Sequence, residues 1–94
     1  MLQLSREILR SEINDLQYKG YEIDTFFNKD SEFHQDAIDE VRYWLTYRLR
    51  DALLDESSIQ LDTNEAGMLL WKLIYDNIGA QVEKEVNEVL NPFV

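Results

Sequence analysis

The chain has 94 residues, no cysteine, and 19 acidic against nine basic residues, which gives a formal net charge of −10. This length fits one domain, residues 1–94, and the lack of cysteine excludes disulfides and thiolate metal sites. No run approaches the roughly 18 apolar residues of a membrane span, and the first ten residues hold no apolar signal core. We therefore expect a single cytoplasmic domain that avoids nucleic acid and membranes and favours basic protein surfaces.

The first helix is predicted over residues 5–19. Ser5 can cap its start, and Gly20 stands where a left-handed residue commonly ends a helix. Apolar residues recur at helical spacing and share one face: Leu4, Ile8, Leu9, Ile13 and Leu16. Glu12 falls within that face, so we expect it to have a partner, because a buried unpaired carboxylate is costly.

The segment 20–30, GYEIDTFFNKD, fits a helix poorly, because apolar or neutral residues alternate with Glu22 and Asp24 at the period of a strand. A single short strand has nothing to pair with in so helical a chain. We predict an extended strap or one helical turn, with Phe26 and Phe27 covering the end of a bundle. The alternative is a strand that pairs with a partner protein or with a second copy.

A long amphipathic helix is predicted over residues 32–54, with Asp30 or Ser31 as its N-cap. At about 100° per residue, its apolar side chains form one face: Phe33, Ala37, Ile38, Val41, Trp44, Leu45, Leu49, Ala52 and Leu53. Arg48 falls inside this face, as Glu12 does in the first helix. We therefore predict that Arg48 is at least partly buried and pairs with Glu12, because a buried charge is tolerable only with a partner.

A third helix is predicted over residues 63–90, with Asp62 and Glu65 at capping-box spacing and Asn91-Pro92 ending it. Its first half, MLLWKLIY, is apolar nearly all round, so we expect it to be the most buried segment. The second half has an apolar stripe of Val82, Val86, Val89 and Leu90, with Glu83, Lys84, Glu85 and Glu88 in solvent. Two glycines leave open a strand over residues 68–75.

Together these elements predict an all-α fold, a small bundle of three principal helices with the segment 20–30 folded over one end. Six side chains are expected to be among the most buried: Trp44, Leu45, Leu49, Leu69, Leu73 and Ile74.

The sequence lacks the usual catalytic and metal-binding patterns. Its one histidine, His34, stands near the start of the long helix, where a capping or structural role is expected. No serine lies in a G-x-S-x-G elbow, and an EF-hand-like start at 62–67 has Leu73 at the position of the final ligand. We therefore predict a non-enzymatic protein without a metal site or cofactor.

Carboxylates and phenols gather on the outer face of the long helix, and we predict that they bind a partner: Glu32, Asp36, Asp39, Glu40, Tyr43 and Tyr47. Carboxylates one helical turn apart stand about 6 Å apart, near the spacing of phosphates along a nucleic-acid strand. Tyrosine is enriched at interfaces. The simpler interpretation of these charges is a solvated helix face.

In gross character, small, acidic, cysteine-free and helical, the chain resembles the inhibitors that phages direct against host nucleases, such as anti-CRISPR proteins. It also resembles immunity proteins that neutralise nuclease toxins. No motif carries the resemblance, so it implies no site residues. We predict a stoichiometric inhibitor that occupies a basic, nucleic-acid-handling surface of a partner protein. An immunity protein is one alternative, and a homodimeric structural or assembly protein is another.

Overall fold

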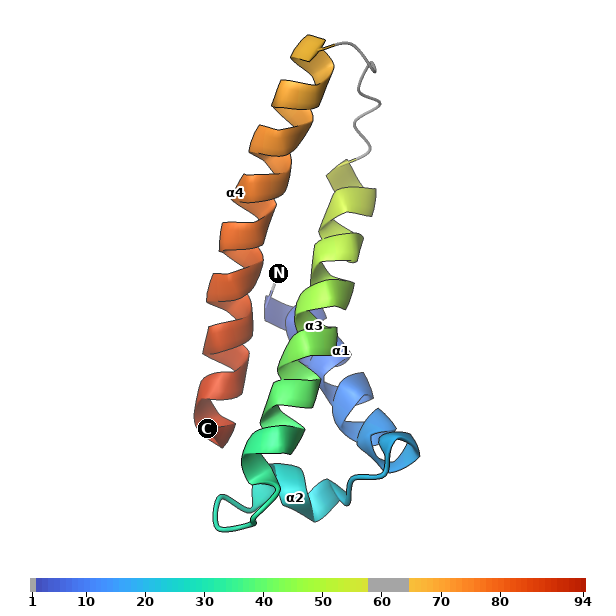
Figure 1. The fold of residues 1–94 in the computed structure, drawn as a ribbon, viewed down its shortest axis with the longest axis vertical. Coiled ribbons are helices and arrows are strands. Elements are labelled where there is room, and N and C mark those ends of the chain that lie inside the picture. Colours follow the sequence, from blue (N-terminus) through green and yellow to red (C-terminus); the bar gives the residue numbers. More distant parts are fainter. Residues whose placement is uncertain (1, 58–64) are drawn as a thin grey trace.

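The computed structural model describes residues 2–57 and 65–94, which are helical almost throughout and include no strand (Figure 1). The elements are α1 (Leu2–Asp15), η1 (Leu16–Lys19), α2 (Ile23–Phe27), α3 (His34–Ser57), α4 (Glu65–Leu90) and η2 (Asn91–Phe93), where η marks a 3-10 helix. The all-α bundle of three principal helices is confirmed. The α2 helix is the single turn predicted within 20–30, and the alternative strand over 68–75 is wrong because that segment is helical.

The molecule is elongated, with principal dimensions of 51 × 23 × 22 Å. The long helices α3 and α4 run side by side in opposite directions, whereas α1 packs against them near one end only (Figure 1). At that end α2 lies beneath the others. Of the described residues, those at one end therefore form a three-helix bundle, and those at the other end belong to α3 and α4.

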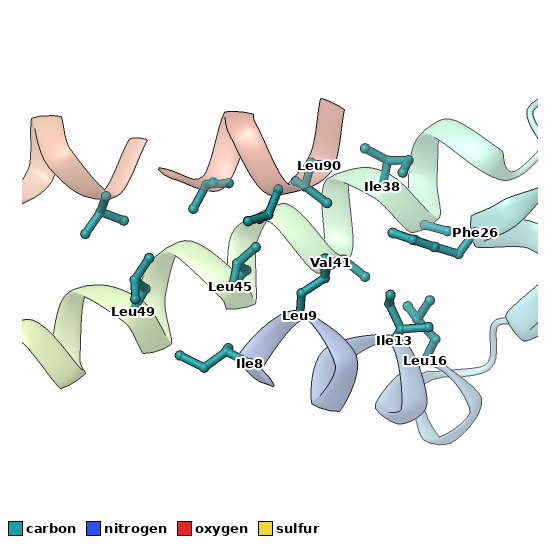
Figure 2. Close-up of a cluster of buried hydrophobic side chains, with 14 of the residues drawn as sticks. Ile8, Leu9, Ile13, Leu16, Phe26, Ile38, Val41, Leu45, Leu49 and Leu90 are labelled. Carbon is teal, nitrogen blue, oxygen red and sulfur yellow. The ribbon is translucent and has the colours of Figure 1, made fainter. Parts of the chain in front are cut away.

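The hydrophobic core lies where α1 meets α3 and α4 (Figure 2). Its fully buried side chains include Leu16, Phe26, Ala37, Ile38, Leu45, Leu49, Val82 and Leu90. Phe26 of α2 closes the end of the core beside Ile38 and Leu16 (Figure 2), as predicted for a residue of the strap. Phe27 lies outside the core and meets the Phe26 ring edge-on, with 5.2 Å between centroids.

The ends of α1 differ in how well the sequence predicts them. Gly20 adopts the left-handed conformation expected after the helix, with φ of 90°. Ser5 is not the N-cap, because α1 already begins at Leu2. Ser5 is instead buried and donates a hydrogen bond to Glu85 Oε1 at 2.8 Å. The prediction that Glu85 faces solvent is therefore wrong, because α1 covers it.

The start of α3 lies two residues later than predicted. Residues 31–33 form a turn in which the Phe33 N–H donates to Ser31 Oγ at 3.4 Å, and the His34 N–H donates to the Ser31 carbonyl at 3.1 Å. Because this turn directs Phe33 away from the helix face, Phe33 is exposed rather than part of the core. His34 is buried, and its Nδ1 lies 3.1 Å from the carbonyl oxygen of Thr25, consistent with the structural role expected for it.

Burial along α4 departs from the prediction at two of its leucines. Leu69 and Leu73 are 62% and 67% exposed, whereas the stripe of Val82, Val86, Val89 and Leu90 is buried as expected. The cause is the short reach of α1, which covers only the C-terminal half of α4 (Figure 1). Of the other four expected core residues, Leu45 and Leu49 are fully buried, and Trp44 and Ile74 are partly buried. The predicted cap at Asp62 lies outside the described residues.

The predicted contact between Glu12 and Arg48 is confirmed. Glu12 is only 4% exposed, and its Oε1 accepts a hydrogen bond from Arg48 Nη1 at 2.9 Å. Its Oε2 accepts from Lys19 Nζ at 3.3 Å, so both carboxylate oxygens have a cationic donor. Arg48 itself is less buried than predicted, because 43% of its side chain is exposed at the edge between α1 and α3.

Candidate functional site

The predicted site residues of α3 lie together at its surface. Tyr43 and Tyr47 are 63% and 50% exposed, and Asp36 and Asp39 are exposed as well. Glu40 is partly buried. With Trp44, which lies among them, these side chains form what we call the acidic–aromatic face: Asp36, Asp39, Glu40, Tyr43, Trp44 and Tyr47.

Glu32 does not continue this face along the helix. It is exposed, but it belongs to the turn that precedes α3. Only Asp36 and Glu40 therefore stand one helical turn apart, about 6 Å along the axis. The prediction that Glu32 shares the outer face of the long helix is wrong, because α3 begins at His34 and does not include Glu32.

Glu40 and Trp44 are fixed by a contact that crosses to η1. Trp44 Nε1 donates a hydrogen bond to Glu40 Oε1 at 2.9 Å. Lys19 Nζ lies 3.7 Å from the same oxygen and 4.8 Å from the centroid of the Trp44 ring, which is a cation–π distance. Glu40 is thus partly neutralised, and the indole is held in place at the edge of the face.

Three aromatic rings form the second half of the face. The Tyr43 and Trp44 rings meet edge-on with 5.2 Å between centroids, and those of Trp44 and Tyr47 do so at 6.1 Å. Edge-to-face pairs at these distances are favourable, and they restrict the motion of each ring. Sequence reasoning missed Trp44 because it placed the residue in the core. The available signal was Glu40 four positions earlier, an acceptor on the same side of the helix.

A cleft of about 600 Å³ opens beside Asp36, between the 20–33 segment and the start of α3. Its lining includes Gly20, Tyr21, Glu22, Thr25, Ser31, Phe33 and Asp36. Glu22 and Asp36 make this cleft acidic, and the exposed ring of Phe33 adds an apolar surface next to them. The cleft extends the acidic–aromatic face toward α2, in a place that helical spacing could not reveal.

The carboxylates at the Asp36 end of the face are free to attract a cationic partner. Within the described residues, no Lys, Arg or His nitrogen lies within ion-pair distance of Asp36 or Asp39, or of Glu32 in the turn before the face. In the described part of the chain, the hydrogen bond that Asp39 accepts comes from Gln35 Nε2, at 2.9 Å. One end of the face therefore offers unpaired negative charge, and the other offers packed aromatic surface.

Residues 2–57 and 65–94 contain neither a candidate metal site nor a helix that could span a membrane. No group of three or more His, Asp and Glu side chains converges there in a way that could hold a metal ion. None of the helices in these ranges combines the length and the apolarity that crossing a membrane requires. Comparisons with protein-family models, with curated proteins and with solved structures find no match for this chain.

Proposed function

We propose that the protein is a non-enzymatic binding module that inhibits a basic partner protein by occupying its nucleic-acid-handling surface. The observation that carries this proposal is the acidic–aromatic face, where unpaired carboxylates adjoin the Trp44 ring and the two tyrosine rings packed against it, all on the outer face of α3. Aromatic side chains clustered at the surface beside several carboxylates are typical of a surface that binds a positively charged protein.

The two halves of the face have different roles in binding. Asp36 and Asp39, together with the net charge of −10, speed the encounter with a cationic surface. Tyr43, Trp44 and Tyr47 then supply desolvated contact area, which slows dissociation. Because Lys19 holds Glu40 and Trp44 in position before binding, little ordering of these side chains is needed in the complex.

Charge reversal at Asp36 and Asp39 to lysine should slow association with the partner about tenfold or more, because steering by opposite charge sets the on-rate of such complexes. Glu40 is left unchanged, since its replacement would also release the Trp44 indole. The matched control reverses Glu83 and Glu88, which are exposed on α4 and change the net charge equally. Surface plasmon resonance at low and physiological salt, with partner recovered from a host extract, gives both rates. Equal slowing by the control would mean that net charge, rather than this face, drives binding.

A second candidate function is a homodimeric structural or assembly protein. The observation that favours it is the exposure of Leu69 and Leu73 on the two-helix end, within a run of residues whose sequence is typical of a buried helix. Two copies related by a two-fold axis would bring the same apolar patch together, the commonest arrangement of soluble oligomers.

An immunity protein, by contrast, would use the acidic–aromatic face against a nuclease toxin.

Sedimentation velocity over a range of protein concentrations tests the dimer. If this candidate is correct, the protein sediments as a dimer at micromolar concentration, and replacing Leu69 and Leu73 by glutamate makes it monomeric. The control places the same two charges at Gln17 and Tyr18, which are exposed on η1. Added salt should not weaken the dimer, because apolar contacts are not screened. A monomer at every concentration, or a dimer unaffected by the leucine changes, would contradict it.

A further inference from the structure

A second surface, distinct from the acidic–aromatic face, carries the opposite charge. Arg6 and Arg10 are exposed, lie one turn apart on α1, and make no hydrogen bond or ion pair with any described residue. Other arginines are engaged: Arg42 donates to Asn87, Arg48 donates to Glu12, and Arg50 donates to Tyr75. Two neighbouring guanidinium groups are therefore available in a chain whose net charge is −10.

An apolar trough runs beside these two arginines. It has a volume of about 310 Å³ and is lined by Arg6, Leu9, Arg10, Ile13, Asn14, Ile23, Phe27 and Phe93. The rings of its aromatic wall are packed together: the Phe93 ring lies 5.1 Å from Phe26 and 5.8 Å from Phe27 between centroids. Phe27 is exposed although it is large and apolar, and it has no role in the core. The trough is thus a preformed apolar site with two cationic groups on its rim.

A second groove continues the site on the other side of the arginine pair. It has a volume of about 450 Å³, and its additional lining residues are Leu2, Glu88, Val89 and Pro92. Both grooves share Arg6, Leu9, Arg10 and Phe93. Glu88 is the one carboxylate in the lining, and it lies beyond ion-pair distance of both arginines. The two grooves therefore form one elongated surface, the Arg6–Arg10 groove, with apolar pockets on either side of a cationic centre.

We propose that the Arg6–Arg10 groove binds an acidic amphipathic segment of a partner protein. Large apolar side chains of that segment fill the two pockets, and its carboxylates accept paired hydrogen bonds from the guanidinium groups of Arg6 and Arg10. Arginines at positions i and i+4 match carboxylates at the same spacing on a helix, the geometry of helix-in-groove recognition.

Charge decides between this occupant and the others. Nucleic acid, an anionic membrane or a second copy of the chain would bring many negative charges against a molecule of net charge −10. A short segment brings only the few carboxylates that the arginines can neutralise. The groove is formed by α1, α2, α4 and η2, whereas the acidic–aromatic face lies on α3. The two surfaces carry opposite charge, so the segment bound here is acidic, whereas the partner proposed above is basic.

The test is a selection from a random peptide library displayed on messenger RNA, with the intact protein as bait. Enriched peptides are expected to combine carboxylates with aromatic or large aliphatic residues. Their affinity, measured by fluorescence anisotropy on synthetic copies, should fall at least tenfold with Arg6→Glu/Arg10→Glu and also with Phe27→Ala. It should change less than twofold with Lys29→Glu/Lys84→Glu, which alters the net charge equally at exposed sites outside both grooves.

Circular dichroism shows whether each variant folds, and Arg6→Gln/Arg10→Gln replaces the double reversal if that one does not. The proposal is overturned if no acidic–apolar peptides are enriched, or if those enriched bind the arginine variant as well as they bind the wild type. It is also overturned if binding to vesicles of anionic lipid, or self-association of the protein, is what the arginine changes abolish.

Discussion

Replacing Leu45 by alanine is expected to lower the free energy of unfolding by about 2–5 kcal/mol, because the change leaves a cavity in a packed core. Leu45 is fully buried between α3 and its neighbours (Figure 2), whereas Leu73 on α4 is 67% exposed. The same substitution at Leu73 is therefore the matched control, with an expected effect within about 0.5 kcal/mol. Urea denaturation followed by circular dichroism measures both.

The comparison of these two leucines also tests the shape of the fold. Sequence periodicity alone treats both as core residues, and only the short reach of α1 separates them. A loss at Leu73 as large as that at Leu45 would contradict the arrangement in which the two-helix end stands uncovered.

The second large effect is expected at the contact between α1 and α3. Replacing Arg48 by methionine should lower the free energy of unfolding by about 1–3 kcal/mol, because buried Glu12 loses a charged hydrogen-bond donor. Lys19 still binds Glu12 and limits the loss. The double variant Glu12→Leu/Arg48→Met should be more stable than Arg48→Met alone, because no buried charge is left without its partner.

A double-mutant cycle by urea denaturation measures this coupling, which should lie between about 0.5 and 3 kcal/mol. The single variants Glu12→Leu and Arg48→Met complete the cycle. Strictly additive effects would contradict a direct ion pair and would leave the 2.9 Å contact without energetic weight.

The three-helix end of the molecule follows closely from residue spacing. The apolar faces of α1 and α3 and the valine stripe of α4 repeat at helical intervals, and they meet as one core. The partnership of Glu12 with Arg48 was predictable for a related reason, because a charge within an apolar face needs an opposite charge on the facing helix.

The spacing of apolar residues does not predict burial where burial depends on the length of a neighbouring helix. The run MLLWKLIY indicates apolarity on all sides, but it does not state how far α1 extends along α4. Leu69 and Leu73 are therefore exposed despite a sequence typical of a buried helix. The predicted burial of Phe33 is wrong for a local reason. The turn that includes Ser31 precedes α3, so α3 begins after Phe33 and its ring is exposed.

In the candidate site too, helical spacing predicts some features, whereas others depend on how the helices pack. Helical phase is enough to place Asp36, Tyr43 and Tyr47 on one exposed face of α3. It does not place Lys19 over the Trp44 ring, because this contact depends on the path of the chain between η1 and α3. The Arg6–Arg10 groove is hidden for that reason too, since η2 reaches α1 from the far end of the sequence.

The most direct test of the proposed function is a competition assay on the partner itself. Labelled nucleic acid bound to the partner is titrated with the wild-type protein, with Asp36→Lys/Asp39→Lys and with Glu83→Lys/Glu88→Lys. The wild type and the α4 control should displace the nucleic acid at a one-to-one ratio, whereas the Asp36/Asp39 variant should fail at the same concentrations. A ternary complex of partner, nucleic acid and wild-type protein, or equal displacement by all three proteins, would contradict the account.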